Sequence, residues 1–333
     1  MAGYKEIKGF QVQTRSEDPT PTEVQTGDFY YNSGSGQFRV VTEGGAPIGT
    51  WSSGGNTNLK RSTSAGAGVS SSAALLMSGY DGSNPTNAVE QYNGSSWTEV
   101  SEVNTGRSYV RGCGTYTAAL CTGGSPSSGS GNELWNGSGW TEVGDLSRPN
   151  GRSDGGQFGT TAAALAFGGE PNSALTEIWD GTSWTEVNDL NTARFAVTGF
   201  GTTTAGVAAN GREPSVSSSA EDWDGTSWTA SGNLNTARGD ARASGVGPAT
   251  TGIIFSGSTG NHTNTVTNTE AYNGSTWSEV ADLSLARYRG IGAGTASSAL
   301  MSTGTNPAVS GIRSTATEEW SAAEFQIKSV TQS

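Results

Sequence analysis

A phrase that recurs at nearly constant spacing constrains the fold of this chain more than any other feature. It begins with Glu, has an aromatic residue two positions later and a turn with Gly, and reaches Trp five positions after the aromatic residue, as in EIWDGTSWTEVNDLNTAR. Five copies begin 43 to 49 residues apart, at Glu90, Glu133, Glu177, Glu221 and Glu270. A period of this length predicts one small structural unit per copy.

A second pattern lies between these phrases. It consists of a Gly-x-Gly approach, a small-residue turn and an apolar run that often closes with Gly-Gly, as in GCGTYTAALCTGG at 112–124 and FGTTAAALAFGG at 158–169. Each period therefore supplies four short strands: the Gly-x-Gly segment, the apolar run, the Glu-x-aromatic segment and the segment that starts at Trp. Asn-Gly and Asp-Gly favour a tight turn between the last two strands. Four strands in about 40 to 50 residues predict the blade of a β-propeller.

The two ends of the repeat region complement each other. The segment from Trp51 to Arg61 has the ten-residue Trp-to-Arg spacing of the repeat, but nothing before it matches the first strands of a blade, whereas Glu318 and Trp320 match the Glu-x-aromatic segment without a following Trp. We therefore expect an all-β chain with six blades, the last closed by pairing of the N-terminal Trp51 strand with the C-terminal Trp320 strand, which would remove open edges. Phe325 leaves open the alternative that FQIKSV is that blade's own outer strand.

Composition agrees with a folded β protein. Gly supplies 50 of the 333 residues, and 10 Trp, 9 Tyr and 9 Phe argue against disorder although the hydrophobic content is only 32%. A net charge of −12 without a basic run disfavours nucleic acid as a partner, and we expect no membrane span. The N-terminus lacks a secretory pattern, so we expect synthesis in a cytoplasm, with Cys113 and Cys121 as buried thiols and a disulfide between them as the alternative.

The repeat resembles a known family. The order of Gly-rich strand, apolar strand ending in Gly-Gly, Glu-x-aromatic-Asn/Asp, Trp, and Leu before Arg is similar to the Kelch repeat over about residues 49–320. NLNTAR together with AALAFGG resembles Kelch-like proteins of tailed bacteriophages, particularly those of marine bacteria, and YKEIKGFQVQTRSEDP followed by GDFYYNSGSGQFRV resembles the head of virion tail proteins such as tail fibres. The resemblance implies a virion component. Asn in place of Asp in three copies, and Asn210-Gly211 in place of a Gly pair, depart from the family pattern.

We interpret the repeated Trp, Glu and Arg side chains as scaffold. Trp is expected to pack between blades, and each Glu is expected to bond to backbone or to an Arg, such as the Arg about 17 residues later in most copies, because buried charges need partners. The structural set is Trp51, Trp97, Trp140, Trp184, Trp228, Trp277, Glu90, Glu133, Glu177, Glu221, Glu270, Glu318, Arg107, Arg194, Arg238 and Arg287.

The sequence offers little for catalysis. A metal centre or a hydrolytic triad needs several converging ligands or a His-assisted nucleophile, and His262 is the only imidazole in the chain. We therefore expect no cofactor, no metal and no enzyme, with a carbohydrate-active enzyme of propeller fold as the third option behind two binding functions.

Variable loops after the second strand of each blade are the candidate binding surface. They are rich in Ser, Thr, Asn and Gly, which suit sugars or a polar protein surface and are also ordinary loop formers. The candidate ligand-binding residues are Tyr80, Asp81, Asn84, Arg212, Glu213, Asn261, His262, Asn306 and Arg313.

The functional hypothesis combines these segments. We expect a virion structural protein, assembled in the host cytoplasm, in which residues 1–48 form a small β extension that docks onto other virion proteins and residues 49–333 form a propeller. The propeller loops would meet a host-surface glycan or protein, and a homo-oligomer on the virion is left open. The alternative is a free lectin-like or adaptor Kelch module.

Overall fold

The structure, a computed structural model, describes residues 13–17, 28–44, 49–126, 129–147, 154–260, 262, 264–307, 312–322 and 324–329. Its regular elements are β-strands. The chain divides into two compact units, one formed by Met1–Thr50 with Ala322–Ser333 and the other by Trp51–Ser321. We call them the terminal unit and the repeat unit.

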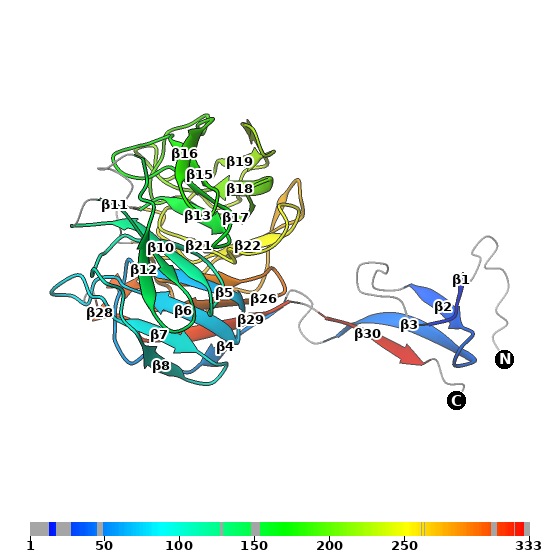
Figure 1. The fold of residues 1–333 in the computed structure, drawn as a ribbon. Helices are drawn as coiled ribbons and strands as arrows, with labels where there is room; N and C mark the ends of the chain where they lie inside the picture. Colours follow the sequence, from blue (N-terminus) through cyan, green and yellow to red (C-terminus); the bar gives the residue numbers. More distant parts are fainter. Residues whose placement is uncertain are drawn as a thin grey trace, which may run out of the picture. The chain divides into compact units, whose positions relative to one another are not determined.

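The repeat unit contains, within its described residues, six four-stranded sheets whose strands follow the predicted order (Figure 1). Sheet 1 has β5 (Ala65–Ser70), β6 (Ala73–Met77), β7 (Val89–Tyr92) and β8 (Trp97–Val100). Sheet 2 has β9 (Arg111–Gly114), β10 (Ala119–Gly124), β11 (Gly129–Trp135) and β12 (Trp140–Val143). Sheet 3 has β13 (Gly156–Gly159), β14 (Ala164–Phe167), β15 (Thr176–Trp179) and β16 (Trp184–Val187).

The other three sheets repeat this pattern, with one exception. Sheet 4 has β17 (Thr198–Thr202), β18 (Ala205–Ala209), β19 (Ala220–Trp223) and β20 (Trp228–Ala230), and sheet 5 has β21 (Arg242–Ala243), β22 (Gly252–Phe255), β23 (Thr269–Tyr272) and β24 (Trp277–Glu279). Sheet 6 takes β25 (Ile291–Gly294), β26 (Ser298–Ser302) and β29 (Thr317–Ser321) from the end of the unit, and its fourth strand is β4 (Thr50–Gly54). A short pair, β27 (Thr305–Asn306) with β28 (Ile312–Arg313), lies in the connection between β26 and β29.

Neighbouring sheets contact each other through their first strands. β5 contacts β9, β9 contacts β13, and the series continues through β17, β21 and β25 back to β5. This arrangement of four-stranded antiparallel sheets is β-propeller-like, so the all-β, propeller-like prediction is confirmed at that level.

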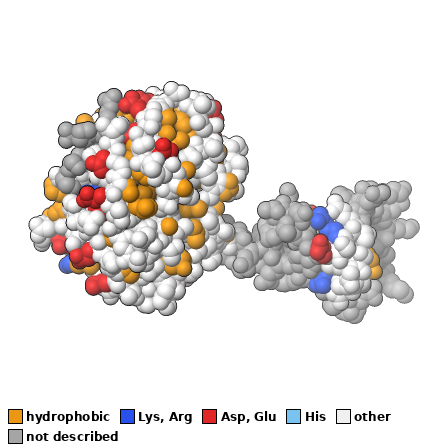
Figure 2. Space-filling view, viewed as in Figure 1, with side chains coloured by type: hydrophobic (Ala, Val, Ile, Leu, Met, Phe, Trp, Pro, Cys, Tyr) orange, Lys and Arg blue, Asp and Glu red, His pale blue; other side chains and the backbone are white. Residues whose placement is uncertain are grey.

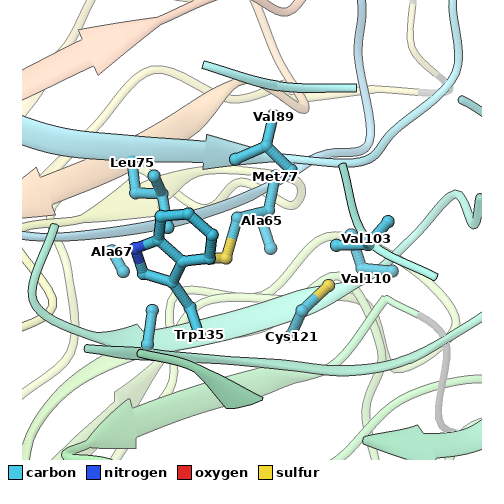
Figure 3. Packing of buried hydrophobic residues seen from close by; sticks show 10 residues of the cluster. Ala65, Ala67, Leu75, Met77, Val89, Val103, Val110, Cys121 and Trp135 are labelled. Carbon is cyan, nitrogen blue, oxygen red and sulfur yellow. The ribbon is translucent and has the colours of Figure 1, made fainter. Parts of the chain in front are cut away.

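The hydrophobic core lies between adjacent sheets rather than inside one of them. In Figure 3 the indole of Trp135, from sheet 2, lies beside Leu75 and Met77, from sheet 1, and all three side chains are buried. In sheets 1 to 5 the aromatic residue of the Glu-x-aromatic segment also faces the following Trp across a hairpin, as Trp179 does Trp184 with ring centroids 5.4 Å apart. Burial of such rings contributes much of the stability in a chain that is otherwise poor in apolar residues.

The repeated Trp residues link neighbouring sheets by hydrogen bonds as well as by packing. Nε1 of Trp228, in sheet 4, donates to Oγ1 of Thr176, in sheet 3, at 3.1 Å. Nε1 of Trp97, in sheet 1, donates in the same way to Thr317 of sheet 6 at 2.9 Å.

The repeated Glu and Arg residues form buried ion pairs, but with partners other than those the sequence suggested. Arg194 pairs with Glu221 at 2.8 Å and Arg238 pairs with Glu270 at 2.7 Å. Each Arg lies in the connection before a sheet and bonds to the third strand of that sheet, so the suggested pairing of Glu177 with Arg194 is wrong. Arg61 with Glu90, Arg107 with Glu133 and Arg287 with Glu318 follow the observed rule.

The two cysteines lie in adjacent strands of sheet 2, and both are buried free thiols. Burial raises the pKa of the Cys113 thiol to about 12 and that of Cys121 to about 11.

The terminal unit is a four-stranded sheet made from both ends of the chain. β1 (Gln13–Arg15) runs parallel to β2 (Phe29–Asn32), which forms a hairpin with β3 (Gln37–Gly44) across the SGSG turn. β30 (Glu324–Ser329) then pairs antiparallel with β3, so a strand from each end of the chain lies side by side (Figure 1). The sequence had assigned residues 322–333 to the propeller, whereas the structure groups them with the first residues of the chain.

Candidate binding site where the sheet connections meet

Six residues, one before the first strand of each sheet, share an unusual backbone conformation. Each lies two positions after a repeat Arg and has φ between 53° and 59°. We call this set the backbone ring: Thr63, Tyr109, Asp154, Ala196, Asp240 and Arg289. Positive φ is uncommon for residues other than Gly, and it marks places where the surrounding structure imposes the conformation.

Backbone hydrogen bonds join the members of the ring from sheet to sheet. The N–H of Asp240 donates to the carbonyl of Ala196 at 3.0 Å, and the N–H of Arg289 donates to the carbonyl of Asp240 at 3.1 Å. The N–H of Thr63 donates to Arg289 at 2.8 Å, which joins the first sheet to the last. Two more bonds, from Ala196 to Asp154 and from Asp154 to Tyr109, complete the observed series.

The buried ion pairs explain how the ring residues that follow Arg61, Arg107, Arg194, Arg238 and Arg287 are positioned. Glu221 accepts a bond from the N–H of Asn191 at 2.7 Å and pairs with Arg194, two residues before Ala196. The carboxylate therefore holds the whole connection against the third strand of the sheet. The scaffold residues thus place the next residues of the chain at the ring.

Three ring residues, Asp154, Asp240 and Arg289, form a charge cluster with Arg212 and His262 that is centred on the buried Asp240. Its Oδ1 accepts a bond from Nε of Arg289 at 2.6 Å, while its Oδ2 lies 3.2 Å from Nη2 of Arg212 and 3.0 Å from Nε2 of His262. Nη2 of Arg289 also lies 3.4 Å from Asp154. Charged groups buried together in this way are stable only when each has partners.

These contacts shift the pKa values of the two carboxyl groups in opposite directions. Burial alone would raise the pKa of Asp240, but the hydrogen bond from His262 and the charge of Arg289 hold it below the ordinary value. Burial, followed by the negative charge of Asp240, raises the pKa of Asp154 to about 6. Asp240 is therefore the carboxyl group of the cluster that loses its proton more readily, and Asp154 is the one that holds its proton more strongly.

A cavity of about 370 Å³ lies beside this cluster, where the connections of sheets 6, 1 and 2 meet. Its wall contains three tyrosines, Tyr80, Tyr109 and Tyr288, with Arg289 and Arg313. The remaining lining residues are Ser62, Thr63, Pro85, Ser108, Ser125, Pro126 and Thr305. Aromatic rings, hydroxyl groups and a few charged groups are the usual lining of a site for a polar small molecule or side chain.

Two of the predicted binding residues meet in this cavity. The guanidinium carbon of Arg313 lies 4.6 Å from the ring centroid of Tyr80, and Nε of Arg313 donates to Oγ of Ser62 at 3.1 Å. Arg212 and His262 lie instead at the charge cluster, where the His262 ring stacks on Tyr288 at 5.2 Å.

The other predicted binding residues stay apart from the cavity lining. Oδ1 of Asp81 accepts bonds from the amides of Ser83 and Asn84, so this segment is a self-contained turn. Glu213 lies 3.7 Å from Nη1 of Arg194, and Asn306 is buried in β27. Asn261 lies outside the described residues.

Tyr109, Asp154, Asp240, Tyr288 and Arg289 were not identified from the sequence. A signal was nevertheless present: the residue two positions after each repeat Arg is Thr, Tyr, Asp, Ala, Asp or Arg, although the flanking phrases are nearly constant. Chemical variation at one fixed position of a repeat is what a binding surface on a repeated scaffold produces.

Much of the repeat unit's surface in the view of Figure 2 carries neither apolar nor charged side chains, in keeping with the abundance of Ser, Thr, Gly and Asn. Within the part of the chain that the structure describes, no group of three His, Cys, Asp or Glu residues is placed to hold a metal ion. The same residues include no helix long and apolar enough to cross a membrane.

Comparisons with known proteins define the class of fold. No family model matches the sequence, and no curated protein matches it. The structure is similar to that of YjhT, a protein of propeller-type fold, with a TM-score of 0.64 over 82% of this chain and 99% of that one. The identity is 12%, so the likeness concerns the fold alone.

Proposed function

We propose that the repeat unit is a closed six-bladed propeller of the Kelch type. Three observations support closure: β4 lies beside β29 in sheet 6, the first strands contact one another in a complete circle, and the backbone ring passes from Arg289 to Thr63. The sequence order of Gly-rich strand, apolar strand, Glu-x-aromatic segment and Trp supports the Kelch resemblance.

We further propose that the protein is a non-enzymatic binding protein whose ligand contacts the cavity beside the backbone ring. The observation that carries this proposal is the wall of Tyr80, Tyr109, Tyr288 and Arg313 around about 370 Å³. Asp240, a buried carboxylate that accepts a bond from Arg289 in this wall, already has three donors around it, which suits a supporting role better than proton transfer. A host-surface glycan or protein is the proposed ligand.

The terminal unit is proposed to dock the chain onto other virion proteins, as the resemblance of its sequence implies. Its surface offers apolar contacts for this purpose. Phe29 and Phe38 are each 45% exposed, and their rings stack at 5.3 Å. Exposed aromatic pairs of this kind are common at protein interfaces.

Two measurements test the proposal. Quantitative mass spectrometry of purified phage particles should find the chain in stoichiometric amount with the tail proteins, and its absence from particles would favour the free lectin-like or adaptor module. Binding of the labelled full chain to host cells should fall with Tyr80→Ala. The matched control is Asn188→Ala, at an exposed Asn outside the cavity lining, which should bind as the wild type does.

A further inference from the structure

We infer that the cavity binds the anionic group of an acidic sugar, a carboxylate or a sulfate, through the guanidinium of Arg313. The inference rests on the proposed binding function and adds the chemical class of the ligand. Three observations support it: the contacts that fix Arg313, the ion pairs that already occupy Arg289, and the other side chains that line the cavity.

Arg313 is fixed before any ligand arrives. Its backbone pairs with Thr305 in the β27–β28 ladder, and Thr305 in turn exchanges backbone bonds with Tyr288, so three cavity residues stand on adjacent strands. The side chain stacks on Tyr80 and is tied to Ser62 through Nε. A guanidinium held at two points loses little conformational entropy when it binds.

The outer edge of Arg313 is available for a ligand. Nη1 lies beside Gly82, but neither Nη1 nor Nη2 has a hydrogen-bond partner among the described residues, and no described carboxylate lies within ion-pair distance of the guanidinium. Asp81 is near enough for Arg313 to help lower its pKa, after the larger effects of the Asn84 and Ser83 amides that its Oδ1 accepts. An arginine with two free amino groups in one plane is suited to bidentate contact with a carboxylate or sulfate.

Arg289, the other cation in the cavity wall, is in a different state. It donates to Asp240 at 2.6 Å, lies 3.4 Å from Asp154, and its guanidinium carbon lies 4.9 Å from the ring centroid of Tyr109. Its charge is neutralised inside the cluster. Among the described residues that line the cavity, Arg313 is therefore the one cation without a carboxylate partner. This arrangement suits a ligand that brings a single anionic group to the cavity.

The rest of the lining favours a sugar over an acidic peptide. Tyr109, which is half-buried, provides a ring against which a pyranose can pack, and the hydroxyls of Ser108, Ser125 and Thr305 can bond to its hydroxyl groups. A peptide with several carboxylates would need more than one free cation and would be repelled by the net charge of −12. A volume of about 370 Å³ suits one or two sugar rings.

The test is direct binding by the full chain, followed by calorimetry or ligand-observed NMR, with glucuronate and glucose 6-sulfate as probes and glucose as the neutral counterpart. We expect the acidic probes to bind more tightly than glucose, and we expect Arg313→Gln to weaken them by at least about tenfold. Arg15→Gln, which removes the same charge from the terminal unit, should leave the affinity unchanged. Thermal unfolding of both variants checks that they fold.

Three outcomes would overturn the inference. They are equal binding of glucose and glucuronate, unchanged affinity in Arg313→Gln, and binding of a glutamate-rich peptide in place of the sugars. The proposed function is judged separately by the host-cell assay: if cells bind the chain and glucuronate does not compete, the ligand class is wrong although the binding function stands. If cells do not bind the chain at all, the binding function itself fails.

Discussion

Glu270 connects two parts of the chain with the two oxygens of one carboxylate. Oε1 pairs with Arg238 at 2.7 Å and Oε2 accepts the N–H of Asn235 at 2.6 Å, while the side chain is buried in sheet 5. Directly across the β23–β24 pair stands Glu279, which is exposed. Two glutamates in register thus experience opposite environments.

Glu270→Gln should destabilise the repeat unit by about 3–5 kcal/mol, because it leaves Arg238 buried without a counter-charge. Glu279→Gln should be neutral or slightly stabilising at pH 7, since burial and then the charge of Glu270 raise the pKa of Glu279 and disfavour its ionised form. Chemical denaturation of both variants checks this. Equal losses of unfolding free energy in the two variants would contradict the role of Glu270 as the buried partner of Arg238.

The sequence predicted which Glu and Arg residues belong to the scaffold, but it did not predict which Glu pairs with which Arg. That buried Glu and Arg must pair follows from elementary electrostatics, but the Arg that follows Glu177 in the same copy folds against the next sheet. The repeat pattern did not indicate Tyr109, Asp240 and Arg289, because the residue at this position varies between the copies.

At the scale of the element, the turn between the third and fourth strands repeats almost unchanged. Oδ1 of Asp180 accepts the amides of Thr182 and Ser183, both at 2.8 Å, and Gly181 has a φ of 97°. Asn93 makes the same two bonds in sheet 1, to Ser95 and Ser96. Because Asp and Asn offer the same acceptor, both fit this turn.

Asp180→Asn should therefore keep the stability of the fold at pH 7, and Asp180→Ala should lower it. The amide of Ser183 and then the Thr182 groups lower the pKa of Asp180 from 3.8 to about 2. A lowered pKa contributes stability above the unfolded value, and this is lost as pH falls through about 2. Thermal melts between pH 7 and pH 2 should show this loss in wild type relative to Asp180→Asn, and parallel curves would contradict it.

The strands and turns were predictable because their signals are local. Asn-Gly and Asp-Gly give the turns, and the Gly-x-Gly segment, the apolar run, the Glu-x-aromatic segment and the Trp segment give the strands. No local pattern predicted the left-handed backbone conformation of the ring. Its residues are not glycines, and their conformation is imposed by bonds between different sheets.

For the whole molecule, the propeller-like arrangement followed from the period of the repeat, whereas the terminal unit did not. The pairing of β3 with β30 joins segments that do not repeat and lie at opposite ends of the chain, so no spacing in the sequence indicates it. Only the hairpin of β2 and β3, with its SGSG turn, was foreseen in this unit.

Truncation tests whether β4 completes the repeat unit. Removal of residues 1–48 leaves Trp51 in place, with its ring 5.5 Å from Trp320 and 5.0 Å from Phe255. Removal of residues 1–54 deletes these contacts and exposes the edge of β29, and we expect a clearly lower melting temperature and aggregation. Light scattering and calorimetry on both truncated chains decide the matter. If both truncated chains have the same melting temperature and neither aggregates, β4 does not close the repeat unit.

The chain enters the repeat unit through β4 and leaves it through β29, which are neighbours in sheet 6, and the flanking strands β3 and β30 pair in the terminal unit. Along the sequence, the repeat unit therefore lies between two paired strands of another small fold. An insertion whose ends lie together can be replaced by recombination without rebuilding its host. The same terminal strands could thus carry different inserted domains in related genomes, and a change of the inserted domain would need a single exchange of coding sequence.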